Sequence, residues 1–393
     1  MEEWKECKLK DICDYGKDRI EVSSLDNSNY ISTENMLPNR AGVTTATTLP
    51  TGEYTPSFEI DDTLVSNIRP YFKKIWKASF SGGCSADVLV FKAKENISKD
   101  YLYYVLADDE FFKYSMATSK GTKMPRGDKV SIMNYPVKLP PLPSQQKIAA
   151  ILSSLDDKIE LNNKINTNLE QQAQALFKNW FVDFEPFGGK MPEGWKEIPL
   201  EQLCTVVTKG TTPTTLGKKF TETGINFIKG ESILDNHTFD LQKISHIDDE
   251  TNDMLKRSVI YENDILFTIA GTLGRFAIID KSLTPANTNQ AVGIIRADIS
   301  QVSPFFLYSF FIGNWHNDYY SKRIQQAVQA NLSLGTIKSL PILIPDKTNM
   351  EKYNNVIEPI FKQMKQLENE NKKLSNLRDT LIPKLMNGEI EVD

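Results

Sequence analysis

Basic side chains gather in two stretches of the chain that contain few carboxylates. Residues 66–94 carry six basic residues and one acidic residue, Asp87, and residues 111–138 carry six basic residues and one acidic residue, Asp128. Stretches with one sign of charge are typical of a surface that faces phosphates, although ordinary solubilising charge is the alternative. The net charge of -5 argues against indiscriminate nucleic-acid binding, but a mean value hides local fields. We therefore expect a local phosphate-facing surface.

Several residue types in this chain suit the reading of DNA bases. Arginine can donate two hydrogen bonds to guanine, asparagine and glutamine can bridge adenine, and lysine offers a compact charge to phosphate. Each asparagine or glutamine could instead cap a turn. The residues predicted to contact DNA are Arg69, Lys73, Lys74, Lys77, Lys120, Lys123, Arg126, Lys209, Lys218, Lys219, Arg275, Asn289, Gln290, Arg323, Gln329 and Asn331.

Motifs for metal or nucleotide chemistry are missing from the sequence. The four cysteines form no CxxC pair and the three histidines are far apart, so we expect no zinc site and ordinary reduced thiols. Residues 271–275 and 188–190 lack the spacing of a Walker loop or a dinucleotide-binding turn. Pro140-Pro141 precedes leucine rather than an aromatic residue, which excludes the usual amino-methyltransferase signature.

One nuclease-like pattern can be proposed, from Pro345-Asp346 together with Glu370-Asn371-Lys372. A metal-dependent nuclease needs convergent carboxylates held on strands, whereas Glu370 falls within a predicted helix. We therefore expect no catalytic residue, no metal and no cofactor in this chain.

A long helix over residues 144–184 is the main predicted scaffold. Its apolar residues alternate in steps of four and three, which is the a/d seam of a heptad repeat. The same register recurs 205 residues later, with Asn166 matching Asn371, so the chain supplies its own partner helix. The predicted apolar seam consists of Ile148, Leu152, Leu155, Ile159, Leu169, Leu176, Ile357, Ile360, Met364, Leu367, Leu374 and Leu381.

An antiparallel pairing of these helices is easier to close across the intervening globular unit, and it would place the two globular units at opposite ends. The alternative is that each helix packs only on its own globular unit. Phe177, Trp180, Phe181 and Phe361 lie beyond the seam, and we expect them on outer faces that a partner protein covers.

The helix ends carry recognisable signals. Ser144 is the expected N-cap of the first helix, and residues 186–189 end it. Residues 348–351 read as a capping box for the second helix, Pro359 is expected to kink it, and Gly388 is its expected C-cap.

The globular parts are duplicated. Residues 4–13 resemble residues 195–204 at an offset of 191, and Leu102-Tyr103 matches Leu307-Tyr308 at an offset of 205. Short β-rich runs with few helices indicate an α+β class. We predict two tandem globular α/β domains separated by a long antiparallel two-helix coiled coil, with a pseudo-twofold duplication. The predicted boundaries are 1–142 and 188–346 for the globular domains, 143–187 for the first helix and 347–393 for the second helix and tail.

Two segments carry a resemblance to a known family. Residues 139–162, LPPLPSQQKIAAILSSLDDKIELN, resemble the central conserved region of the specificity subunit of type I restriction–modification systems, and residues 381–390, LIPKLMNGEI, resemble its distal conserved region. Residues 67–74 and 271–275 look like the family's strand-turn segments, and Asn289-Gln290 and residues 329–332 resemble its polar loops.

The resemblance implies two target recognition domains that each read one half of a split site in double-stranded DNA. It implies docking of modification subunits, expected to be two, that carry S-adenosylmethionine, and of a restriction subunit that uses ATP and Mg. The second helix start, residues 345–351, departs from the Pro-Ser-Gln-Gln entry of the first, so we expect unequal docking surfaces.

We therefore interpret the chain as a non-catalytic DNA-reading specificity subunit. The alternatives are a coiled-coil adaptor that reads no DNA, and a nuclease or methyltransferase with an unrecognised site. An acidic start at Glu2-Glu3 and the lack of a long apolar run predict a cytoplasmic location without a membrane span.

Overall fold

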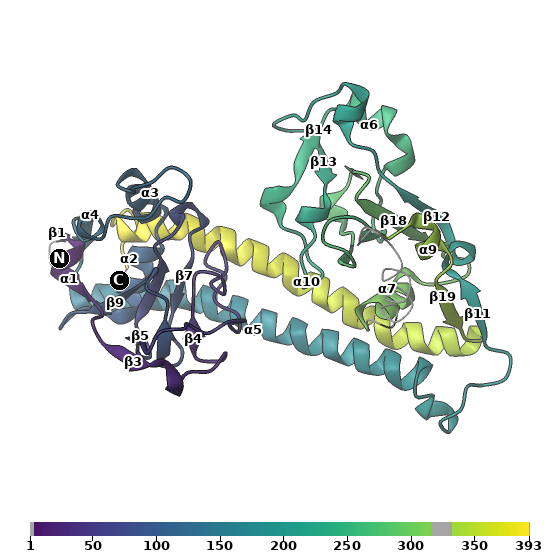
Figure 1. Ribbon diagram of the computed structural model, residues 1–393, viewed down its shortest axis with the longest axis horizontal. Coiled ribbons are helices and arrows are strands. Elements are labelled where there is room, and N and C mark those ends of the chain that lie inside the picture. Colours follow the sequence, from purple (N-terminus) through teal and green to yellow (C-terminus); the bar gives the residue numbers. More distant parts are fainter. Residues whose placement is uncertain (1–3, 314, 316–331, 393) are drawn as a thin grey trace. The chain divides into compact units, whose positions relative to one another are not determined.

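The computed structural model describes residues 4–313, 315 and 332–392, and these form two compact units (Figure 1). The first unit comprises Met1–Asn162 and Asn369–Asp393, and the second comprises Asn163–Glu368. Two long helices, α5 (Leu142–Phe181) and α10 (Lys347–Met386), each begin in one unit and end in the other. Each unit therefore contains part of both helices.

Within residues 4–139, the globular part of the first unit is built from three sheets and four short α-helices. The antiparallel four-stranded sheet has the order β2 (Cys13–Tyr15), β9 (Val88–Ala93), β6 (Thr63–Ser66) and β7 (Ile75–Lys77). The other sheets have the orders β3 (Arg19–Glu21), β5 (Tyr54–Phe58), β8 (Gly82–Cys84), β4 (Tyr30–Ile31), and β1 (Lys5–Lys8), β10 (Pro136–Leu139). The helices are α1 (Leu9–Ile12), α2 (Lys99–Ala107), α3 (Asp109–Ala117) and α4 (Lys129–Ile132).

The second unit repeats this plan. Its four-stranded sheet has the order β12 (Cys204–Lys209), β18 (Val292–Ala297), β15 (Ile265–Thr268) and β16 (Phe276–Ile278). Its other sheets have the orders β14 (Ser245–Ile247), β13 (Ile225–Ile228), β17 (Ala286–Thr288), and β11 (Lys196–Pro199), β19 (Pro341–Ile344). The described helices are α6 (Asp249–Met254), α7 (Pro304–Ile312) and α9 (Leu334–Lys338).

Strand register confirms the predicted duplication and the α+β class. Lys5 pairs with Leu139 in the first unit, and Lys196 pairs with Ile344 in the second, so the offsets of 191 and 205 recur in the register. The four-stranded sheets also connect their strands in the same order, since β2-β9-β6-β7 corresponds to β12-β18-β15-β16.

The central strands are buried on both faces because successive side chains point to opposite sides of a sheet. Val65 of β6 lies in the core that includes α2 and the start of α5, whereas its neighbour Leu64 lies in a separate core that includes β8. In the second unit Phe267 and Leu266 of β15 divide between two cores in the same way. In each unit, the four-stranded sheet therefore has one face covered by helices and the other face covered by a second sheet.

The two long helices are antiparallel within each unit. In the first unit, Ile148 and Leu152 near the start of α5 share a core with Ile382 near the end of α10. In the second unit, the ring centroids of Phe181 near the end of α5 and Tyr353 near the start of α10 are 4.8 Å apart. The same helix residues also pack on the globular part of their unit. The long helices therefore pack both on each other and on the globular parts.

The apolar face of each helix is wider than the predicted seam. Ile148, Leu152, Leu169 and Ile357 are buried, whereas the other predicted seam residues are partly exposed: Leu155, Ile159, Leu176, Ile360, Met364, Leu367, Leu374 and Leu381. A helix that faces a globular core buries a broader stripe than a two-stranded coiled coil.

This wider stripe corrects the expectation for the aromatic residues beyond the seam. Phe177, Phe181 and Phe361 are buried in the core of the second unit, and Trp180 packs against that core while partly buried. They are therefore not an outer docking surface.

The helix ends differ slightly from the expected ones. Helix α5 begins at Leu142, which places Ser144 in the first turn, and it ends at Phe181. The carboxylate of Asp346 accepts the backbone N–H of Asn349 at 3.1 Å and caps α10 in place of the predicted box. Helix α10 continues through Pro359 without interruption. Gly388 ends it with a φ of 73°, as expected of a glycine C-cap.

Candidate nucleic-acid interface

Backbone hydrogen bonds bring the two predicted basic stretches of the first unit together. The loop after β6 meets a small hairpin, because Ile68 forms a β-bridge with Arg126 and the N–H of Arg69 donates to Pro125 O at 2.8 Å. A second bridge, between Lys120 and Arg126, closes the hairpin. We name residues 67–74 and 120–126 the turn-hairpin surface.

Most of the cations predicted to contact DNA already have a carboxylate or carbonyl partner. Lys74 donates to Thr33 O at 2.6 Å. The ion pairs are Lys73–Asp109, Lys77–Asp100, Lys120–Asp128, Arg126–Asp87, Lys218–Glu250 and Arg275–Asp235. Four predicted cations have neither an ion-pair partner nor a side-chain hydrogen bond within the residues that the structure describes: Arg69, Lys123, Lys209 and Lys219. Exposed pairs contribute little to stability, so a phosphate can replace the carboxylate at low energetic cost.

Local contacts shift the pKa values of Lys74 in the turn-hairpin surface and of Asp128 beside it. Burial lowers the pKa of Lys74, an effect that the nearby Glu34 opposes. A hydrogen bond from Lys120 and further bonds from Ser131 hold the pKa of Asp128 below its usual value. The cations of this surface are thus partly neutralised by carboxylates that lie beside it.

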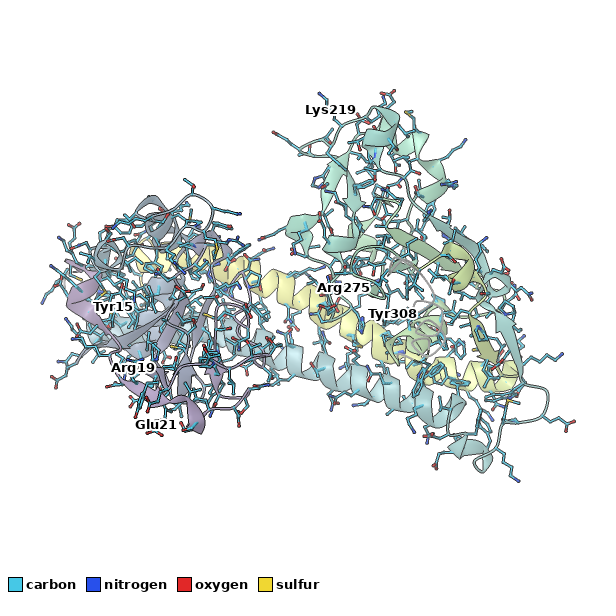
Figure 2. The ribbon with its side chains drawn as sticks, in the orientation of Figure 1. Tyr15, Arg19, Glu21, Lys219, Arg275 and Tyr308 are labelled. Atoms are coloured by element: carbon cyan, nitrogen blue, oxygen red, sulfur yellow. The ribbon has the colours of Figure 1, made fainter. Side chains whose placement is uncertain are left out.

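In the second unit, the loop between β12 and β13 approaches the loop after β17. The hydroxyl of Thr212 donates to Gln290. Asn289 Oδ1 accepts the N–H of Ala291 at 3.1 Å, so the Asn289 side chain caps a turn. Gly210 permits the approach, because a Cβ there would lie 1.9 Å from Thr288 O. Figure 2 shows Lys219 at the periphery of this unit, where its side chain is exposed.

Arg275 lies in a more constrained place than the sequence suggests. Its guanidinium forms a two-pronged pair with Asp235 at 2.6 and 2.7 Å, and it also donates to Ile233 O at 3.1 Å. Base contact by Arg275 therefore requires loss of that pair. Arg323, Gln329 and Asn331 lie outside the described residues.

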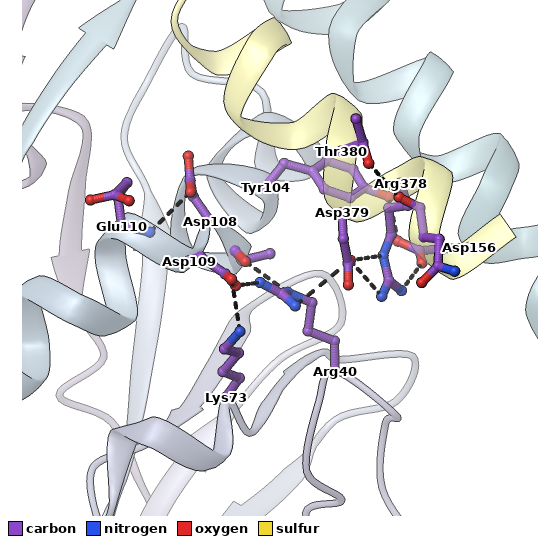
Figure 3. A network of polar contacts seen from close by, with 12 residues as sticks. Arg40, Lys73, Tyr104, Asp108, Asp109, Glu110, Asp156, Arg378, Asp379 and Thr380 are labelled. Atoms are coloured by element: carbon purple, nitrogen blue, oxygen red, sulfur yellow. Dashed lines mark hydrogen bonds and ion pairs between the residues drawn. The ribbon is translucent and has the colours of Figure 1, made fainter. Parts of the chain in front are cut away.

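An ionic network around the buried side chain of Arg40, not predicted from the sequence, ties the turn-hairpin surface to a helix of the first unit (Figure 3). Arg40, whose side chain is 4% exposed, pairs with Asp109, which also accepts from Lys73 at 2.8 Å. Burial alone would raise the pKa of Asp109, but hydrogen bonds from Lys73 and Arg40 outweigh it and hold that pKa below its usual value. Arg40 Nη1 also lies 3.7 Å from Asp379 of α10.

The network continues between the two long helices. Arg378 of α10 donates to Asp156 of α5 at 2.7 Å and lies 2.9 Å from Asp379. The hydroxyl of Tyr104 on α2 donates to Asp156 at 2.8 Å. The corresponding positions of the second unit, Phe361 and Ala173, are apolar and lie in one core, so the duplicated halves differ at this layer.

A polar layer lies between the helices at Asn162. The side-chain amide of Asn162 is fully buried and donates to Asn371 Oδ1 at 2.8 Å and to Glu370 at 2.9 Å. Asn371 thus meets Asn162 rather than Asn166, its counterpart in the repeat. A buried polar layer fixes register. Glu370 of the nuclease-like pattern is engaged here, and the described residues contain no group of three or more side chains that could hold a metal.

These observations define a duplicated α+β chain with two long helices and a basic loop surface in its first unit. The family model described as "Type I restriction modification DNA specificity domain" matches residues 1–171 and 192–378, and the chain belongs to this family. Among the helices that the structure describes, none is long and apolar enough to cross a membrane.

Individual relatives agree with the family match. The chain is 26% identical to the HindI type I restriction enzyme specificity subunit of Haemophilus influenzae, over 99% of this chain and 100% of the relative. It is 26% identical to the MjaIX specificity subunit of Methanocaldococcus jannaschii, over 76% of this chain and 71% of the relative. The crystal structure of an S subunit from M. genitalium is similar in fold, with a TM-score of 0.56, 14% identity, and coverage of 99% of this chain and 97% of that one.

Proposed function

We propose that the chain is the DNA-reading subunit of a type I restriction–modification complex. Each unit reads one half of a bipartite site in double-stranded DNA, and helices α5 and α10 set the distance between the half-sites. The observation that carries the proposal is the repeat of one α+β plan in two units that share two continuous helices. Cations of the turn-hairpin surface in the first unit, and Lys209 and Lys219 in the second unit, supply phosphate contacts to two segments of one duplex.

The chemistry in this proposal is divided among subunits. Two modification subunits dock on helices α5 and α10 and bind S-adenosylmethionine, and a restriction subunit binds ATP and Mg. The two docking sites are unequal, because the helix starts differ. Gln145 of α5 accepts the Ser98 N–H at 3.0 Å and donates to Pro140 O at 2.9 Å. Met350 holds the corresponding position of α10 and lines a cavity of about 580 Å³.

Mapping of methylated adenines in the host genome tests the proposal. A strain with the gene and a strain without it are compared, and a bipartite methylated motif is expected to disappear with the gene. An unchanged methylation pattern in a strain whose modification subunit is expressed would contradict the proposal. The remaining interpretation would then be a coiled-coil adaptor that reads no DNA.

Two neighbouring lysines offer a matched test of phosphate contact. Lys219 is exposed without an ion-pair partner among the described residues, whereas Lys218 pairs with Glu250 at 2.7 Å. Lys219→Ala is expected to weaken binding to all DNA sequences and to lower the slope of log affinity against log salt by about 1. Fluorescence anisotropy at several salt concentrations measures this slope. Lys218→Ala is the control, and an equal change in both variants would show that the pairing does not decide the contact.

A further inference from the structure

The turn of the turn-hairpin surface has an unusual backbone conformation. Arg69 (φ 50°) and Lys73 (φ 49°) flank the 3-10 turn Pro70–Phe72, and both have left-handed conformations that disfavour residues with a Cβ. A second turn, with Asn39 at a φ of 57° and Arg40 at 62°, lies against it. Four residues of one small region therefore adopt a conformation that is rare outside glycine.

Specific contacts hold this conformation. The N–H of Asn39 donates to Phe72 O at 2.8 Å, and the N–H of Arg40 donates to Lys73 O at 3.0 Å. The side chain of Arg40 donates to Ala107 O at 2.7 Å, and the shared Asp109 joins Arg40 to Lys73. Strained backbone persists where the surrounding structure fixes it, and such places cluster at functional sites.

The turn presents two aromatic side chains to solvent. Tyr71 is 49% exposed and Phe72 is 38% exposed, and their ring centroids are 4.6 Å apart. Met124, at the tip of the hairpin, is 48% exposed. The ammonium of Lys74 lies 5.9 Å from the centroid of the Phe72 ring. The Lys74 ammonium thus lies beside the apolar tip, and Arg69 and Lys73 adjoin the two aromatic residues in the chain.

The charge around this tip favours DNA over an apolar protein partner. The turn-hairpin surface contains six basic residues, namely Arg69, Lys73, Lys74, Lys120, Lys123 and Arg126, and no acidic residue of its own. Three of them, Lys73, Lys120 and Arg126, pair with the neighbouring carboxylates Asp109, Asp128 and Asp87, which a phosphate can replace. Proteins that distort DNA insert apolar side chains between base steps and hold the flanking phosphates with cations. A rigid tip loses little conformational freedom on insertion, because its backbone is already fixed.

We propose that Tyr71 and Phe72 form an aromatic wedge that opens one base-pair step within the half-site of the first unit. This inference rests on the proposed function and assigns these residues a role in specificity, since the cost of unstacking depends on the step. The corresponding loop of the second unit, between β15 and β16, contains no aromatic residue among residues 269–275. The distortion is therefore confined to one half-site.

The test uses the full chain with its modification subunits and duplexes of the site found by methylation mapping. 2-Aminopurine is placed in turn at each adenine except the methylated ones, because a methyltransferase flips its target base out of the stack. Opening of a step raises 2-aminopurine fluorescence. We expect an increase of about threefold or more at one position of the first half-site on binding, and none in the second half-site. Tyr71→Ala and Phe72→Ala are expected to abolish the increase and to weaken binding about tenfold.

Tyr54→Ala provides the matched control, because Tyr54 lies on β5 of the same unit and is 45% exposed. It is expected to keep both the fluorescence increase and the affinity. Specific binding without a fluorescence change in the wild-type protein, or a change that survives both turn variants, would overturn the wedge and leave the proposed function intact. The absence of any sequence-dependent binding would instead overturn the proposed function.

Discussion

Replacement of Arg378 by alanine is expected to lower the free energy of unfolding of the chain by about 3–5 kcal/mol. The Arg378 side chain is 7% exposed and bridges Asp156 and Asp379, so its removal leaves the carboxylate of Asp156 partly buried without its cation. Urea denaturation of the full chain, followed by tryptophan fluorescence and circular dichroism, measures the loss.

Two control variants separate charge from packing. Lys158→Ala removes an exposed pair with Glu370 in the same helix pair, at 3.8 Å, and is expected to cost less than about 1 kcal/mol. The double variant Asp156→Phe with Arg378→Ala copies the apolar layer of the second unit, Phe361 and Ala173, and is expected to recover most of the stability. A loss of less than about 1 kcal/mol in Arg378→Ala would show that the Arg378–Asp156 pair does not stabilise the chain as expected.

Lengthening both long helices is expected to lengthen the spacer of the DNA site. Asn162 meets Asn371, so residues 162–165 of α5 face residues 368–371 of α10 in an antiparallel pair. Repeating both segments once adds four residues to each helix, or about 6 Å of rise, and preserves the polar layer. Because one base-pair step is about 3.4 Å, the methylated site should gain one or two base pairs between unchanged half-sequences.

Sequencing of methylated genomic DNA from cells that carry the variant decides this prediction. Repeating residues 162–165 alone is the control, because it displaces Asn162 or its copy from Asn371 and leaves a buried amide without a partner. That variant is expected to reduce methylation. An unchanged spacer in the double insertion, or altered half-sequences, would show that the helices do not set the distance between the half-sites.

The large features of this chain could be predicted because they repeat. A constant offset and a heptad pattern identify the duplicated units and the two helices, and the register of Lys5 with Leu139 and of Lys196 with Ile344 agrees with those offsets. The helix starts were displaced by only a few residues, since Asp346 competes as a cap with the predicted box.

The functional surface was less accessible to sequence reasoning. The network of Arg40, Asp109 and Asp379 joins residues that are distant in the chain and follow no period. Pairing of the predicted cations, such as Arg275 with Asp235, depends on loop geometry that spacing does not fix. Exposure of Tyr71 also lacked a signal, because an aromatic residue after a buried strand ordinarily joins the core.

The ionic pair Asp156–Arg378 and its apolar counterpart Phe361–Ala173 affect how the long helices can pair between two copies of the chain. If α5 of a second copy took the place of α10, the repeat would set Ala173 of that copy opposite Asp156, and the carboxylate would lose its cation. If α10 paired with its own copy, Arg378 would face Phe361. Pairing of α5 with α10 matches the carboxylate with its cation and the two apolar side chains with each other. The chain therefore favours closure on itself over pairing of like helices from two molecules.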